Sequence, residues 1–108
     1  MTEEAEERRV GEGSDPSVPV LVRHLVISNR RGLHARAAAK FVTLAERFGA
    51  SVDVVKDGQA VSSRSIMGLM MLGAGMGSPI ELRAEGWDAK EAIEALAALV
   101  EAGFNEQD

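Results

Sequence analysis

Residues 51–62, SVDVVKDGQAVS, decide the fold class. Val52 and Val54 alternate with more polar residues, which is the period of a strand with one buried face. The Asp57-Gly58 pair that follows is a strong signal for a two-residue hairpin, and residues 59–62 return as the next strand. The stretch therefore predicts an antiparallel hairpin whose apolar face has to be covered by the rest of the chain.

Two further strands and three helices are predicted on either side of this hairpin. The strands are β-branched or alternate apolar and charged residues, and the helices repeat apolar residues at helical spacing. The order β-α-β-β-α-β-α predicts an α+β fold, a four-stranded antiparallel sheet with three helices on one face. The strands are expected over 20–28 and 79–85, and the helices over 35–48, over 66–72 and from 89 to the glycine at 103.

Local end signals mark the helices. Gly49, Gly73 and Gly103 follow the last apolar position of each predicted helix, where a left-handed cap is favoured. Ser65 stands where an N-cap of the second helix is needed. Ahead of the third helix, Asp88 and the glutamate three residues later predict a capping box.

The composition is that of one domain with an acidic extension. The 108 residues are 45% hydrophobic and 27% charged, with a net charge of −5. Residues 1–19 carry six acidic and two basic residues among glycine, serine and proline. Such a segment buries too little apolar surface to fold, so a disordered acidic tail over 1–19 and a single domain over 20–108 are expected.

Several classes of protein are disfavoured by the same composition. The acidic balance argues against a nucleic-acid surface. No stretch approaches the roughly 18 apolar residues that span a bilayer, and the acidic first residues do not resemble a secretory signal. The chain has no cysteine, which removes disulfides and thiolate metal sites. A cytoplasmic protein without a metal or cofactor is expected.

The segment RGLHAR, residues 31–36, is the part of the sequence best suited to chemistry. It places His34 at the start of a predicted helix, where free N–H groups and the helix dipole favour an anion. The dipole also favours a neutral imidazole, which is a nucleophile. Arg36 can add a charged hydrogen bond to a phosphoryl group, and Gly32 lets the preceding backbone come close. The other histidine, His24, lies on a strand and is interpreted as a surface residue.

This segment resembles the phosphorylation-site motif of the histidine-containing phosphocarrier family (HPr) of the phosphotransferase system. Residues 65–73, SIMGLMMLG, resemble that family's regulatory-serine segment, and residues 101–106, EAGFNE, are similar to its usual close. The resemblance runs from residue 20 to the C-terminus and implies an open-faced β-sandwich. It departs at Ala37, where most members have proline.

The resemblance also implies roles for residues and partners. His34 matches the histidine that receives a phosphoryl group from Enzyme I and passes it to EIIA-type acceptors. Arg36 matches the neighbouring arginine, and Ser65 matches the serine modified by HPr kinase/phosphorylase. A monomeric carrier of sugar transport or of nitrogen-linked regulation is implied, rather than an enzyme, and the sequence leaves the branch open.

A partner surface is expected beside these residues. Six apolar side chains between Ile66 and Leu72 exceed what one side of a two-turn helix can bury, so Ile66, Met67 and Met70 are expected on the surface. Arg36, Lys40 and Arg47 recur on one side of the preceding helix and would form a basic edge to this patch.

Two other functions remain open at this point. One is a regulator of the same fold that acts by docking to another protein instead of relaying phosphoryl groups. The other is a small-molecule-sensing α+β domain, in which the His34 segment has no purpose.

Overall fold

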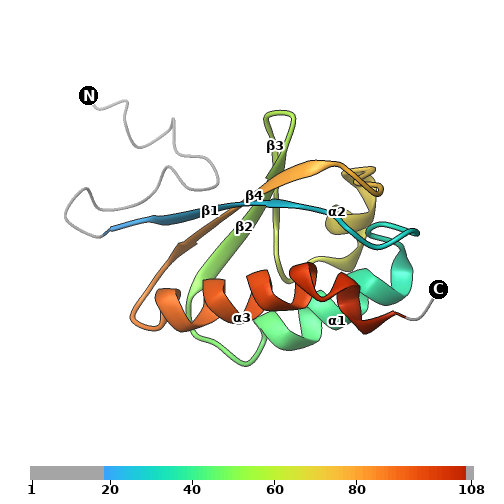
Figure 1. The fold of residues 1–108 in the computed structure, drawn as a ribbon. Coiled ribbons are helices and arrows are strands. Elements are labelled where there is room, and N and C mark those ends of the chain that lie inside the picture. Colours follow the sequence, from blue (N-terminus) through green and yellow to red (C-terminus); the bar gives the residue numbers. More distant parts are fainter. Residues whose placement is uncertain (1–18, 107–108) are drawn as a thin grey trace.

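A computed structural model describes residues 19–106 of the chain. Its elements follow the predicted order and type (Figure 1). The tail predicted over residues 1–19 lies outside the described residues apart from Pro19. The elements are β1 (Leu21–Val26), α1 (Ala35–Ala45), β2 (Ser51–Lys56), β3 (Gln59–Ser62), α2 (Ile66–Met71), β4 (Pro79–Glu85), α3 (Ala89–Glu101) and a short turn, η1 (Gly103–Asn105).

The four strands form one antiparallel sheet in the order β1-β4-β2-β3. The predicted hairpin joins β2 to β3, and its turn residues Asp57 and Gly58 have φ of 51° and 80°. Positive φ at both turn positions matches the right-handed twist of the strands, which is why this dipeptide is favoured there. The last strand, β4, lies between β1 and β2, so the first strand joins the sheet only through the last one.

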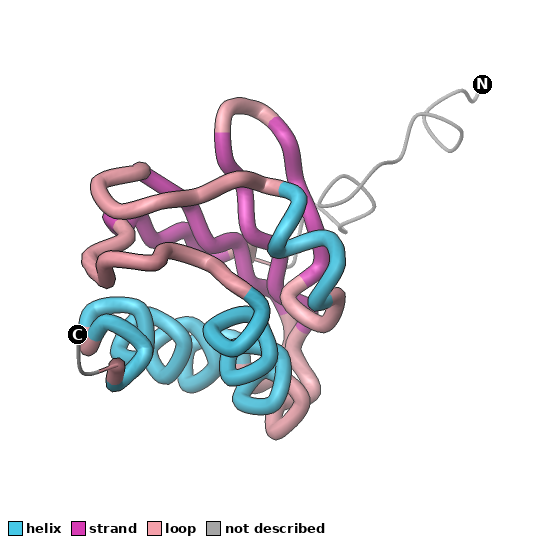
Figure 2. Tube along the Cα trace, turned by 90° about the vertical axis from the view of Figure 1, so that its right-hand side faces the viewer, coloured by secondary structure: helices cyan, strands magenta, loops and turns pink. Residues whose placement is uncertain are grey.

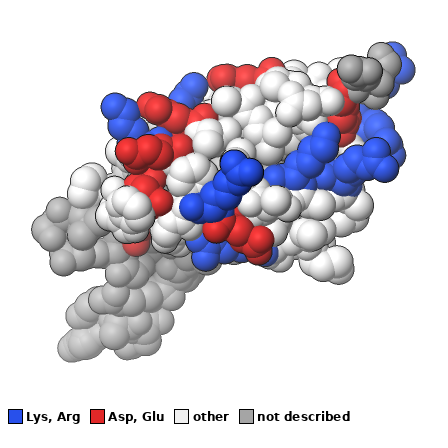
Figure 3. All heavy atoms as spheres, turned by 90° about the horizontal axis from the view of Figure 1, so that it is seen from below, with Lys and Arg blue, Asp and Glu red and all other residues white. Residues whose placement is uncertain are grey.

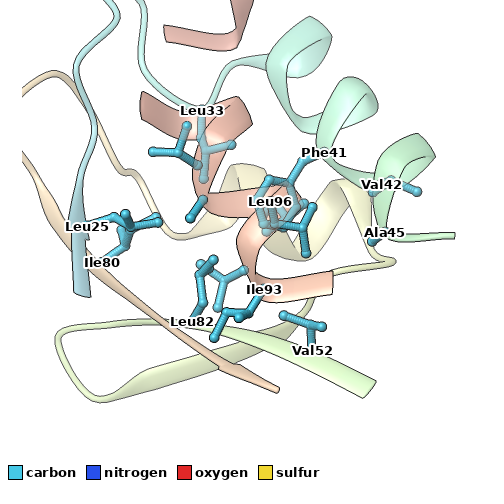
Figure 4. Close-up of a cluster of buried hydrophobic side chains, with 14 of the residues drawn as sticks. Leu25, Leu33, Phe41, Val42, Ala45, Val52, Ile80, Leu82, Ile93 and Leu96 are labelled. Atoms are coloured by element: carbon cyan, nitrogen blue, oxygen red, sulfur yellow. The ribbon is translucent and has the colours of Figure 1, made fainter. Parts of the chain in front are cut away.

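The three helices cover one face of the sheet, and the other face is open (Figures 1 and 2). Phe41 of α1, Leu96 of α3 and Leu82 of β4 meet in the core between the layers (Figure 4). On the open face Val22 and Val26 remain about half exposed, as the alternation along β1 predicts. The predicted open-faced α+β sandwich is therefore confirmed.

The end of α1 differs from the prediction. The helix stops at Ala45, and residues 46–48 form a tighter turn in which the Phe48 N–H donates to the Ala45 carbonyl over 3.2 Å. Gly49 does not have the left-handed φ of a C-cap. A Cβ at this position would lie 2.7 Å from Nε1 of the Trp87 indole, so a larger residue would require the exposed Trp87 side chain to move.

The capping box predicted at the start of α3 is also wrong. Asp88 occupies the N-cap position, but its carboxylate makes no capping hydrogen bond within the helix. It accepts instead from the backbone N–H groups of Gly49 and Ala50, over 2.9 and 2.8 Å. The buried carboxylate thus satisfies two N–H donors of the α1–β2 connection, a partner that local spacing does not reveal. The predicted cap of α2 and the left-handed glycines at Gly73 and Gly103 are confirmed.

Candidate functional site

His34 lies at the N-cap position of α1, with φ −77° and ψ 179°. The backbone that leads to His34 is fixed by Gly32, which has φ +66°. Gly32 packs so closely that a Cβ would lie 2.4 Å from the Ala74 carbonyl oxygen. The Leu33 N–H donates to the same oxygen over 2.9 Å, and the Leu33 side chain is buried. The loop after α2 therefore holds the residues that place His34 at the start of α1.

The backbone at the start of α1 presents free donors beside the imidazole. The first intrahelical bond runs from the Ala38 N–H to the His34 carbonyl, over 2.8 Å. The N–H groups of Ala35, Arg36 and Ala37 have no acceptor within residues 19–106. Free N–H groups at the positive end of a helix dipole bind phosphate and other anions. Ala37 keeps one of these donors, which a proline at this position would lack.

Glu106 contacts His34 and is the residue that sequence reasoning missed. Its carboxylate is hydrogen-bonded to His34 Nε2, and the two side chains keep only 10% and 16% of their exposed surface. This hydrogen bond from His34, and then one from Asn29, hold the pKa of Glu106 below its ordinary range. The two residues are 72 positions apart, so only the resemblance of the C-terminal segment to the family could have drawn attention to Glu106.

This contact decides which ring nitrogen of His34 is available. An ionised carboxylate only accepts hydrogen bonds, so Nε2 carries a proton. In the neutral ring Nδ1 then has the free lone pair, and no capping hydrogen bond from the helix engages it. The arrangement presents a single nucleophilic nitrogen at the start of α1, where the free N–H groups lie.

The predicted basic residues line one open groove between α1 and α3. Arg36, Lys40 and Arg47 border a groove of about 420 Å³ with an apolar floor that includes Leu44 and Leu99. Figure 3 shows blue Lys and Arg side chains, with red Asp and Glu side chains beside some of them, on the otherwise white surface of the molecule seen from below. Lys40 is half-buried, and its Nζ donates to the Phe104 carbonyl over 2.7 Å. Lys40 is therefore engaged within the domain, which the sequence did not indicate.

The apolar side chains of α2 that exceed what one side of the helix can bury lie on the surface, as predicted. Leu69 and Leu72 are buried, whereas Ile66 and Met70 are about 40% exposed and Met67 is 68% exposed. Met71 is exposed as well. Helix α2 packs against α1, so this patch lies on a helix that adjoins the one carrying His34.

Ser65 caps α2 as predicted. Its hydroxyl accepts a hydrogen bond from the Gly68 N–H over 2.9 Å. The other histidine, His24, is exposed on β1 with its Nδ1 3.9 Å from a carboxylate oxygen of Glu81, in agreement with its interpretation as a surface residue. Within residues 19–106 no group of three His, Asp or Glu side chains is placed to hold a metal ion. No helix in this part of the chain is long and apolar enough to cross a membrane.

Fold and site together define a class: small open-faced α+β proteins that present an imidazole beside the free N–H groups of a helix. Comparison with known proteins agrees. The family model described as "PTS HPr component phosphorylation site" matches residues 21–102. The chain belongs to the HPr family of phosphotransferase-system phosphocarriers.

Individual relatives and solved structures cover nearly the whole domain. The phosphocarrier protein HPr of Cupriavidus necator is 46% identical over 87 residues, which are 81% of this chain and 98% of the relative. The phosphocarrier protein NPr of Shewanella violacea is 45% identical over 86 residues, 80% and 94% of the two chains. The crystal structure of HPr from Thermoanaerobacter tengcongensis has a TM-score of 0.78 at 44% identity and covers 82% of this chain and 99% of its own.

Proposed function

We propose that Nδ1 of His34 accepts a phosphoryl group from Enzyme I and passes it to EIIA-type acceptors. The observation that carries this proposal is the occupied Nε2: with Glu106 bound there, the free lone pair lies on Nδ1 at the start of α1. The family is one of phosphocarriers, so the protein carries the group stoichiometrically rather than catalysing a reaction of its own.

The transfer needs one bond made and one broken. The Nδ1 lone pair attacks phosphorus, the N–P bond forms, and the bond to the donor group of Enzyme I breaks with its electron pair leaving on the donor. The phosphoryl oxygens come to lie beside the free N–H groups of Ala35, Arg36 and Ala37. Transfer to an acceptor reverses the same steps, and His34 leaves as a neutral ring.

Arg36 supports the transfer by charge. Its side chain is exposed next to His34 on the first turn of α1 and makes no hydrogen bond to the described residues. It is free to bind the phosphoryl oxygens when they arrive. Truncating Arg36 to alanine removes one charge-assisted contact, which is worth on the order of 2–3 kcal/mol if the contact tightens in the transition state.

Docking is assigned to the exposed apolar side chains of α2 and the basic groove. Ile66, Met67 and Met70 offer an adaptable apolar surface. Arg36 and Arg47 would attract acidic partner surfaces. The whole relay takes place in the cytoplasm, and the carrier works as a monomer.

Regulation is assigned to Ser65, as a target of HPr kinase/phosphorylase. A phosphate there adds about −1.5 to −2 charge beside Ile66 and Met67, and an acidic partner chosen to match the basic groove would be repelled. The expected effect of Ser65→Asp is a higher KM for Enzyme I with a smaller change in kcat.

The test of the carrier function is transfer of labelled phosphoryl from phosphoenolpyruvate through Enzyme I. His34→Ala should abolish acid-labile labelling while circular dichroism stays unchanged, because the side chain caps no backbone group. His24→Ala is the matched control: it removes the other histidine, which is exposed on the sheet, and should label like the wild type. Normal acid-labile labelling of His34→Ala would show that the group resides on another residue, whereas a wild type that takes up no label would favour the docking-only function.

A further inference from the structure

The C-terminal turn returns the chain to the start of α1 through an unusual backbone. Gly103, Phe104 and Asn105 are three successive residues with φ of 63°, 57° and 58°. A bulky residue such as Phe rarely adopts this left-handed conformation, so the surrounding structure has to impose it. The Phe104 side chain is fully buried, and its carbonyl accepts from Lys40 Nζ over 2.7 Å. Glu106 is the residue that follows this turn.

Asn29 binds the carboxylate of Glu106, which this turn places next to the start of α1. It follows β1, keeps only 6% of its exposed surface, and its Nδ2 donates both to the Gly32 carbonyl over 2.9 Å and to Glu106 Oε1 over 3.1 Å. Because both partners are acceptors, the amide can face only one way. Glu106 is therefore held by Asn29 at one oxygen and by His34 at the other.

The same amide leaves its own acceptor unpaired. Asn29 Oδ1 is buried without a hydrogen-bond partner among the described residues. An unpaired buried acceptor lowers the stability of the fold. A residue chosen only for packing would avoid that cost. The donors of Asn29, rather than its shape, thus explain its presence next to the phosphorylation site.

We propose that Asn29 is a positioning residue for phosphoryl transfer, which holds Glu106 so that the His34 proton stays on Nε2 throughout the cycle. This inference rests on the proposed function of His34. The ring attacks through Nδ1 while Nε2–H faces the carboxylate. The phosphorylated ring then carries a positive charge, which Glu106 compensates. When the group leaves, the neutral ring departs with the same proton, so none is exchanged with solvent.

The first test follows the titration of Glu106 in the full chain, by ¹³C NMR of its carboxyl carbon. In Asn29→Ala the pKa of Glu106 should rise towards its ordinary value of 4.5, because one of its two hydrogen bonds is lost. The other groups that face Glu106, His34 and Arg31, are unchanged in this variant. A merely structural role for Asn29 would not move this titration in a variant whose circular dichroism is normal.

The second test is the rate of transfer from Enzyme I. Asn29→Ala should lower kcat/KM about tenfold, which is the loss expected for one hydrogen bond to a charged group. Asn29→Asp keeps the shape of the side chain but sets a carboxylate against Glu106, so its loss should be larger. Adding Glu106→Gln to Asn29→Asp restores a donor and an acceptor in this pair, and should recover part of the rate.

The outcomes separate this inference from the proposed function. Failure of wild-type His34 to accept a phosphoryl group would overturn the proposed function and, with it, any part for Asn29 in transfer. Normal wild-type transfer together with an unchanged Glu106 titration or an unchanged rate in folded Asn29→Ala would overturn the positioning role alone. Asn29→Asp and its Glu106→Gln double variant showing the same rate would also contradict it.

Discussion

At the scale of single residues, the pair of His34 and Glu106 makes folding stability depend on pH. The pKa of Glu106 is lowered in the fold below its ordinary value of 4.5, chiefly by the hydrogen bond from His34. Its contribution to stability is therefore complete above about that pH, and it is lost as the pH falls through the lowered value of the folded state. The groups that face Glu106 are His34, Asn29 and Arg31.

Urea unfolding of the wild type and Glu106→Gln, from neutral to acidic pH, measures this linkage. The wild type should be the more stable protein at neutral pH, and the difference should shrink below pH 4.5. The same comparison in a His34→Ala background should show a smaller shrinkage, because the main cause of the pKa shift is gone. A difference in unfolding free energy that stays constant over the whole pH range would contradict the contact.

Single residues were predictable where their chemistry is local. The segment from Arg31 to Arg36 predicts an imidazole at the start of a helix, because a glycine, a histidine and an arginine adjoin the helical repeat of apolar residues. Asn29 and Glu106 give no such signal. Their contact spans 77 positions and depends on a left-handed turn at Phe104, which no propensity favours. Sequence patterns therefore pointed to His34, the proposed nucleophile, but missed Asn29 and Glu106 beside it.

At the scale of elements, α2 depends on Ser65 as its cap. The hydroxyl accepts the Gly68 N–H, and the helix has only six residues, so one lost hydrogen bond is a large share of its local stability. Ser65→Ala should cost about 1 kcal/mol in the free energy of unfolding. Ser65→Asp keeps an acceptor and adds a negative charge at the helix start, so it should be about as stable as the wild type.

Urea unfolding of the two variants, together with Enzyme I kinetics, separates the structural from the regulatory role of Ser65. If Ser65→Asp leaves KM unchanged while Ser65→Ala loses stability, the serine acts only as a cap. If both are as stable as the wild type, the cap contributes little.

Elements were predicted well where their signals lie within a few residues. The Asp57-Gly58 hairpin, the Ser65 cap and the glycine ends of α2 and α3 were all confirmed. The predictions at Gly49 and Asp88 were wrong for a shared reason. These two residues bond to each other across 39 positions, and this tertiary contact replaced both the glycine cap and the capping box. Capping rules that use only neighbouring residues do not detect a partner that the tertiary fold brings close.

At the scale of the whole molecule, folding and transfer should both reside in the domain. The core side chains come from the stretch between Leu25 and Phe104, and β1, the first element, is a sheet edge paired only to β4. Residues 1–18 hold a large share of the chain's excess negative charge and few apolar residues. They therefore have little to add to the buried area on which stability depends.

Deleting residues 1–18 should leave the melting temperature within about 2 °C of the full chain, since 1 kcal/mol corresponds to roughly 4–8 °C in a domain of this size. Differential scanning calorimetry of both chains decides the point. Measuring phosphoryl transfer at low and moderate salt adds a second test, because an acidic segment that competed for the basic groove would slow transfer chiefly at low salt. A fall of many degrees on deletion would mean that these residues pack on the domain. A deletion that speeds transfer only at low salt would instead mean that they occupy the groove lined by Arg36 and Arg47.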